Sequence, residues 1–211
     1  MTPHAVLWDL DGTLADTATD IALTVNEMLV GAGLPPLPLT DVHTIIGSGA
    51  GHLVDRAVRA AGGVPEARHL HAFLEGYRAQ PRRVAELYPG VADLLAEVRT
   101  PQAVVTNKPA GVSRALLGAL GVAGHFRVLV GGDTLPVRKP DAAPVHTAMR
   151  ELGCTAAVMV GDGPHDVGAA RAAGIPCIGV LWGIGVPAGA DRTVRDVPAL
   201  REALATWGAL R

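Results

Sequence analysis

The feature that most constrains the fold is the alternation of short apolar runs with helical segments. Four runs after residue 88 resemble buried strands, each followed by a segment with helical spacing, and a fifth run opens the chain. The five runs are residues 5–8, 103–105, 128–130, 157–160 and 177–180. Repeated strand–helix units form parallel sheets with helices on both faces. Because 49% of the residues are hydrophobic but only 3% aromatic, the strands must be aliphatic, which suits such a sheet. We predict an α/β fold, a Rossmann-like parallel sheet core flanked by helices.

Residues 16–84 interrupt this alternation. They show helical spacing but no convincing strand; Ile21, Val25 and Met28, for example, fall on one helical face. The simplest organisation is a discontinuous α/β core of residues 1–15 and 85–211. Residues 16–84 are then an all-helical cap domain inserted after the first strand.

Charge and hydropathy exclude several classes of function. The formal net charge of −2 leaves no electrostatic footprint for nucleic acid or an anionic membrane. The uncharged stretch 172–190 is long enough for a membrane helix, but its five glycines and two prolines favour a strand and a loop. The two cysteines lack metal-binding or redox spacing, and the N-terminus lacks a signal-peptide pattern. We expect a cytoplasmic protein without a nucleic-acid or membrane partner.

Polar side chains follow the predicted strands, where parallel sheets bind ligands. Asp9 and Asp11 come directly after the first run, and Gly12 lets the chain turn there. Two adjacent carboxylates are costly to bury without a cation between them. A divalent metal and a phosphate-bearing substrate account for them; the alternative is a surface turn with solvated aspartates. Later strand ends supply Thr106, Asn107, Lys108, Asp162 and Asp166, and Lys139 precedes a helix.

The choice of lysine at two positions favours the functional interpretation. The chain has 18 basic residues, and only Lys108 and Lys139 are lysines. A compact ammonium approaches a phosphoryl oxygen differently from a planar guanidinium. Both exceptions lie in predicted strand-end loops, which is unexpected for solvated surface lysines.

These segments together resemble the haloacid dehalogenase superfamily, and within it the phosphoglycolate phosphatases. The resemblance rests on residues 9–16 (DLDGTLAD), 105–109 (VTNKP), 131–136 (GGDTLP), 139–140 (KP) and 161–167 (GDGPHDV). The chain departs from the family pattern at Trp8, Ala142 and Gly163, none of which removes a catalytic group. The family's helical cap corresponds to residues 16–84.

The resemblance implies a Mg²⁺-dependent phosphomonoester hydrolase acting through an aspartyl-phosphate. Asp9 would be the nucleophile and Asp11 the general acid and base. Mg²⁺ would be held by Asp9, the backbone carbonyl of Asp11, Asp162 and Asp166, the last directly or through water. Thr106 and Lys139 would be catalytic groups that hold the phosphoryl oxygens. Gly12, Thr13, Asn107 and Lys108 would also contact the substrate, a small phosphorylated metabolite such as 2-phosphoglycolate.

The cap offers weaker candidates. Gly47 and Ser48, at a predicted helix start, could bind an anion through backbone N–H groups. Arg56 could bind a substrate carboxylate or be a surface arginine. His165 is expected to be an exposed loop residue, and His43, His52, His69 and His71 to be surface residues of the cap.

Other reactions on the same scaffold stay open. A sugar phosphomutase resembling β-phosphoglucomutase would use the same aspartate pair, and a pyrophosphatase or sugar phosphatase would differ only in the cap. A hydrolytic dehalogenase needs no acid at position 11, so Asp11 argues against it. A non-enzymatic binding module would be expected to lack at least one catalytic group. The protein would be a monomer or a homodimer.

Overall fold

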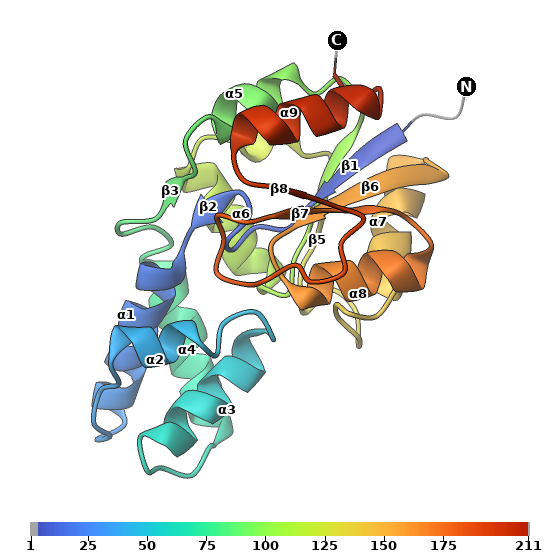
Figure 1. The fold of residues 1–211 in the computed structure, drawn as a ribbon. Helices are drawn as coiled ribbons and strands as arrows, with labels where there is room; N and C mark the ends of the chain where they lie inside the picture. Colours follow the sequence, from blue (N-terminus) through green and yellow to red (C-terminus); the bar gives the residue numbers. More distant parts are fainter. Residues whose placement is uncertain (1–3, 211) are drawn as a thin grey trace.

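Six parallel strands form the central sheet of the computed structural model, which describes residues 4–210. The strand order is β5-β4-β1-β6-β7-β8 (Figure 1). The strands are β1 (His4–Trp8), β4 (Gln102–Val105), β5 (Val128–Val130), β6 (Ala156–Gly161), β7 (Cys177–Val180) and β8 (Arg192–Val194). The predicted α/β class and its five predicted strands are confirmed; β8 is the addition. Its three residues carry no apolar periodicity, so the sequence gives no signal for it.

Helices cover both faces of this sheet (Figure 1). Along β1, Val6 and Trp8 pack against α5, α6 and α9, whereas Ala5 and Leu7 pack against α7 and α8. This alternation buries every other side chain on one face, as in parallel sheets covered on both sides. The five helices are α5 (Val91–Glu97), α6 (Ala110–Ala119), α7 (Ala143–Leu152), α8 (Pro164–Ala173) and α9 (Val197–Thr206), with a short 3₁₀ helix η1 (Ala123–His125) after α6.

Four helices between β1 and β4 form a separate hydrophobic cluster below the sheet in Figure 1. It contains α1 (Ala18–Gly31), α2 (Leu39–His43), α3 (Ala50–Ala60) and α4 (Ala67–Ala79). Ile21, Val25 and Met28 of α1 are buried in it on one face, as their spacing predicts. Val112 of α6 is the member of this cluster that comes from a helix flanking the sheet.

The chain leaves and re-enters the sheet region through a two-stranded antiparallel ribbon. Its strands are β2 (Ala15–Asp16) and β3 (Glu86–Leu87), which pair Asp16 with Glu86. The buried carboxylate of Asp20 accepts hydrogen bonds from the backbone N–H groups of residues 83–85, at 2.8, 2.9 and 3.2 Å. The outgoing and returning segments are therefore fastened together. Two-residue strands are too short to show a period, so the sequence analysis missed them.

The uncharged stretch 172–190 contains β7 and a loop, as its glycines and prolines predict. Within residues 4–210, every helix is too short or too polar to cross a membrane.

Candidate active site

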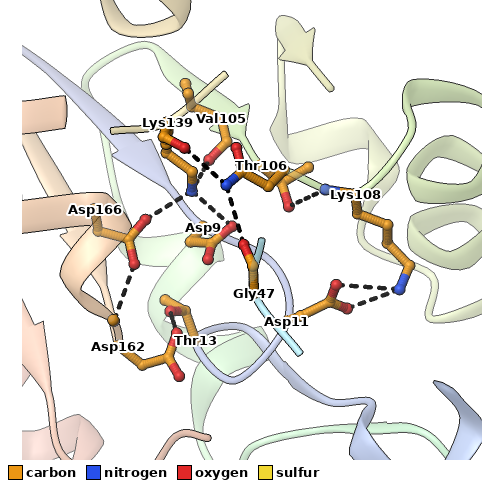
Figure 2. Close-up of polar contacts among 12 residues, drawn as sticks. Asp9, Asp11, Thr13, Gly47, Val105, Thr106, Lys108, Lys139, Asp162 and Asp166 are labelled. Atoms are coloured by element: carbon orange, nitrogen blue, oxygen red, sulfur yellow. Dashed lines mark hydrogen bonds and ion pairs between the residues drawn. The ribbon is translucent and has the colours of Figure 1, made fainter. Parts of the chain in front are cut away.

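The polar residues predicted at the strand ends meet at one edge of the sheet. They line a cavity of about 240 Å³ between the sheet and the helices α1–α4. Asp9 follows β1, Thr106 follows β4 and Asp162 follows β6, while Lys139 lies in the loop before α7. Because parallel strands end at the same edge, residues more than 150 positions apart become neighbours. Figure 2 shows their arrangement.

Three carboxylates converge in this cavity. One oxygen each from Asp9, Asp162 and Asp166 lies within 4.8 Å of the others. The backbone N–H groups of Ile184 and Gly185 donate to Asp162 Oδ2, both at 2.8 Å. Asp166 lies in the first turn of α8, which starts at residue 164. Both buried carboxylates are thus oriented by the backbone around them.

Lys139 is the cation that joins this acidic cluster. Its ammonium lies 2.6 Å from Asp166 Oδ1 and 2.9 Å from Asp9 Oδ1, and it donates to the Val105 carbonyl at 2.6 Å (Figure 2). Burial alone would lower the pKa of Lys139, but the two ion pairs outweigh burial and raise that pKa above its ordinary value. Lys139 is therefore a fixed positive charge.

The structure of the cluster fits a divalent cation. Among residues 4–210, the buried Asp9 Oδ1 has only the Lys139 ammonium, at 2.9 Å, to compensate its charge. Burial raises the pKa of Asp9 to about 6, because the attraction of Lys139 only partly offsets the loss of solvation and the neighbouring carboxylates add repulsion. Burial likewise raises the pKa of Asp162 and of Asp166. A divalent cation that prefers oxygen ligands would contact Asp9 Oδ1 and would offset the cost of burying the three carboxylates.

Asp11 lies apart from this cluster, although only two residues separate it from Asp9. Its carboxylate accepts hydrogen bonds from Lys108 Nζ at 2.9 and 3.1 Å (Figure 2). It also accepts one from Thr17 Oγ1 at 2.7 Å. The Lys108 ammonium also lies 4.3 Å from the centre of the Tyr77 ring. Burial would lower the pKa of Lys108, but Asp11 and Tyr77 outweigh it and raise that pKa. Lys108 therefore pairs with Asp11, whereas Lys139 pairs with Asp9 and Asp166.

Gly12 and Thr13 do not line the cavity but lie next to Asp162, one of the residues that do. The Thr13 hydroxyl donates to Asp162 Oδ1 at 3.2 Å, and the Gly12 N–H donates to the Ala15 carbonyl at 2.9 Å. Gly12 has a φ of 81°, and a side chain there would collide with the Asp162 carboxylate. Neither residue lines the cavity, and the substrate contacts predicted for them stay predictions.

Asn107 connects the strand end to the loop before α3. Its side-chain N–H groups donate to the Gly47 and Lys139 carbonyls, both at 3.0 Å, and its Oδ1 has no partner among the described residues. In the same loop, the Ser48 hydroxyl lies 3.3 Å from His165 Nε2. Helix α3 is capped by Gly49 and not by Ser48, and the Gly47 carbonyl that Asn107 contacts lies three residues before the helix begins. His165 lines the cavity and is half-buried, which corrects the expectation of an exposed residue.

Two cap histidines depart from their expected places, and Arg56 takes the surface position that the sequence left as one of its two alternatives. Arg56 is exposed on α3 and does not line the cavity, so it is not positioned to bind a carboxylate there. His43 and His69 are not surface residues. His43 lines the cavity, and His69 is buried with its Nδ1 accepting the Glu66 N–H at 3.1 Å, which caps α4. Helical periodicity alone cannot show which side of a small bundle faces the sheet.

Sequence reasoning missed four residues of the site: Thr17, Tyr77, Ile184 and Gly185. Tyr77 lies at a buried position of α4 beside apolar residues, so its polar end gives no separate signal in the sequence. Ile184 and Gly185 act through backbone N–H groups, which any residue type can supply. For Thr17, the spacing of six residues from Asp11 fits no regular element, so the contact depends on the turn between them.

Comparison with known proteins agrees with this geometry. The sequence profile of the haloacid dehalogenase-like hydrolases matches residues 6–180. A phosphoglycolate phosphatase of Rhodospirillum rubrum is 41% identical over 86% of this chain and 80% of its own. The crystal structure of a predicted phosphoglycolate phosphatase from Haemophilus somnus has a TM-score of 0.84 and 28% identity, covering 96% of this chain and 97% of that one.

A second similar solved structure is a complex with a ligand. It is a variant of CbbY from Rhodobacter sphaeroides in complex with xylulose-1,5-bisphosphate, with a TM-score of 0.80 and 28% identity over 92% of this chain and 94% of that one. The family resemblance seen in the sequence motifs is confirmed by the profile and by the relatives. The chain belongs to the haloacid dehalogenase-like hydrolase family.

Proposed function

We propose that this protein is a Mg²⁺-dependent phosphatase that hydrolyses a small phosphorylated metabolite through a phosphorylated Asp9, with 2-phosphoglycolate as the leading substrate. The observation that carries the proposal is the position of Lys139 between Asp9 and Asp166, beside a third carboxylate and at the floor of a cavity. Hydrolysis of a phosphate monoester needs charge neutralisation and an in-line nucleophile. This cluster offers both. The named relatives support the choice of substrate.

Asp9 is the proposed nucleophile because its carboxylate lines the cavity and one of its oxygens is without a hydrogen bond. A bond would form between an Asp9 oxygen and phosphorus while the bond between phosphorus and the ester oxygen breaks. Lys139 would bind the phosphoryl group and keep Asp9 in place. Thr106, at the adjacent strand end, would add a hydroxyl donor to a phosphoryl oxygen.

Asp11 is the proposed proton carrier. It would protonate the departing alkoxide, and it would then accept a proton from the water that hydrolyses the phosphorylated Asp9. The ion pair with Lys108 and the hydrogen bond from Thr17 fix its carboxylate beside the cavity.

Mg²⁺ would be held by Asp9 and Asp162, with the backbone carbonyl of Asp11 as a further ligand. When bound, the cation offsets negative charge on the phosphoryl oxygens. Both carboxylate oxygens of Asp166 already accept hydrogen bonds, from Lys139 and from the Gly163 N–H. We therefore assign Asp166 mainly to positioning Lys139 and a bound water.

Residues 16–84 are proposed to act as the cap domain over this site. The contacts of Asn107 with Gly47 and of His165 with Ser48 would close the cavity over the substrate and exclude water. The β2–β3 ribbon lies where the cap would pivot. The cytoplasmic location, and a monomeric or dimeric state, stay predictions.

A sugar phosphatase is the second candidate, supported by the xylulose-1,5-bisphosphate complex of the CbbY variant. We expect Mg²⁺-dependent phosphate release from 2-phosphoglycolate, which Asp9→Asn or EDTA abolishes. The test is a panel of 2-phosphoglycolate, glucose 6-phosphate, xylulose 5-phosphate and pyrophosphate. Full activity of Asp9→Asn, or no release from any phosphate monoester, would refute the proposal. Isomerised sugar phosphate without free phosphate would indicate a mutase.

A further inference from the structure

Buried polar atoms without partners are concentrated in the cavity. Six buried side-chain atoms lack a hydrogen bond within residues 4–210, and four belong to residues that line the cavity. These four are Asp9 Oδ1, Asn107 Oδ1, His43 Nε2 and Tyr77 OH. A buried polar atom without a partner costs stability, so such a concentration needs an explanation. The proposed metal and phosphoryl group account for Asp9 alone.

His43 and Tyr77 stand opposite the strand ends, on the wall made by the cap helices. His43 is the last residue of α2 and Tyr77 lies in α4. The other side chains that this wall contributes are mostly apolar, among them Ile21, Leu53 and Phe73. Tyr77 is only 1% exposed, and the Lys108 ammonium lies 4.3 Å from the centre of its ring. Its hydroxyl is desolvated, lies near Lys108 and has no well-aligned hydrogen bond within residues 4–210.

These groups suit a particular kind of ligand. A phenol hydroxyl and an imidazole Nε2–H can both donate hydrogen bonds, and the Lys108 ammonium, which is paired with Asp11, lies beside the Tyr77 ring. Two donors suit a compact anionic acceptor. A sugar chain presents several hydroxyl groups that each need partners, and this largely apolar wall has few to offer.

We propose that His43 and Tyr77 are specificity-determining residues that bind a carboxylate at the non-phosphoryl end of the substrate. The inference rests on the proposed phosphatase function, and it assigns the substrate class to phosphate esters of short hydroxy acids. Arg56, the carboxylate ligand considered from the sequence, is exposed outside the cavity. His43 and Tyr77 replace it in this role.

The test compares two phosphate esters that differ only in the carboxylate: 2-phosphoglycolate and ethyl phosphate. We expect Tyr77→Phe and His43→Leu each to lower kcat/KM for 2-phosphoglycolate roughly 10- to 100-fold, the effect of losing one hydrogen bond to a charged group. The variant-to-wild-type ratio for ethyl phosphate should stay within about threefold of unity, because no carboxylate is present. Tyr88→Phe is the matched control. Tyr88 is the only other tyrosine and packs against Trp182 outside this cavity.

A binding measurement separates recognition from chemistry. In the Asp9→Asn background, calorimetry should show weaker binding of 2-phosphoglycolate by Tyr77→Phe and unchanged binding of inorganic phosphate. Tyr77→Phe should melt no lower than wild type, since the lost hydroxyl has no partner in the folded chain.

The two possible failures are distinguishable. If wild type hydrolyses no phosphate monoester, the proposed function is refuted and the inference with it. If wild type is active but Tyr77→Phe affects both esters equally, or affects neither, the function stands and the carboxylate assignment is overturned. A loss confined to sugar phosphates would likewise overturn it.

Discussion

Replacing Asp9 with asparagine should stabilise the metal-free protein at neutral pH. Burial raises the pKa of Asp9 from about 4 to about 6, despite the ammonium of Lys139 at 2.9 Å. A shift of roughly 2 pKa units corresponds to about 3 kcal/mol of unfolding free energy. Because the pKa is raised in the folded state, this stability is present below pH 4 and is lost as the pH rises through 6. Asparagine stays neutral, so Asp9→Asn avoids the loss.

Thermal denaturation in EDTA measures this effect. For a chain of this size about 3 kcal/mol corresponds to a rise in Tm of roughly 6–12 °C. We expect Asp9→Asn to melt that much higher than wild type at pH 7.5, and within about 2 °C of it near pH 4, where Asp9 is protonated in the folded state and about half protonated in the unfolded state. Asp55→Asn, at an exposed aspartate of α3, is the matched control and should show no such pH dependence.

Mg²⁺ should reverse the order of stability. Cation binding selects the ionised form of Asp9, so saturating Mg²⁺ should raise the Tm of wild type more than that of Asp9→Asn. The reasoning is refuted if Asp9→Asn is no more stable than wild type in EDTA at pH 7.5. A stabilisation of equal size at pH 4 and pH 7.5 would also refute it, because ionisation of Asp9 would then not be the cause.

Three further substitutions test the supports of the site. Lys139→Met should abolish phosphate release and cost about 3–5 kcal/mol in urea denaturation at neutral pH, because two buried carboxylates lose their counter-ion; an unchanged midpoint contradicts this. Gly12→Ala should cost at least about 1 kcal/mol, from its φ of 81° and the collision with Asp162, and should weaken Mg²⁺ binding measured by calorimetry; normal Mg²⁺ affinity argues against it. Asp20→Asn should cost about 1–3 kcal/mol and speed hydrogen exchange at the amides of residues 83–85, since their shared acceptor loses its charge. Exchange that is faster everywhere, and not at those amides in particular, would show that Asp20 has no local role.

The sheet and the acidic cluster were the predictable part of this molecule. A buried parallel strand is recognisable in the sequence as an apolar run, and ligands bind at the carboxyl ends of such strands. The positions of Asp9, Thr106 and Asp162 could therefore be predicted without coordinates. No comparable rule identifies which residues of the cap helices line the opposite wall of the cavity. Arg56 and Tyr77 both lie on amphipathic helices, and their spacing shows that one face is buried but not what that face meets. Contacts made by backbone N–H groups, such as those of Ile184 and Gly185 with Asp162, leave no trace in residue type.

The pairing of Asp16 with Glu86 has a consequence for how this family can change. The insert between them, residues 17–85, begins and ends next to paired strands, so its two ends lie side by side. An insert with adjacent ends can be exchanged without adding loop-closure entropy or altering strand order. Evolution, or a protein engineer, could therefore graft a different helical unit onto Asp16 and Glu86 and redirect the same reaction chemistry to a new substrate.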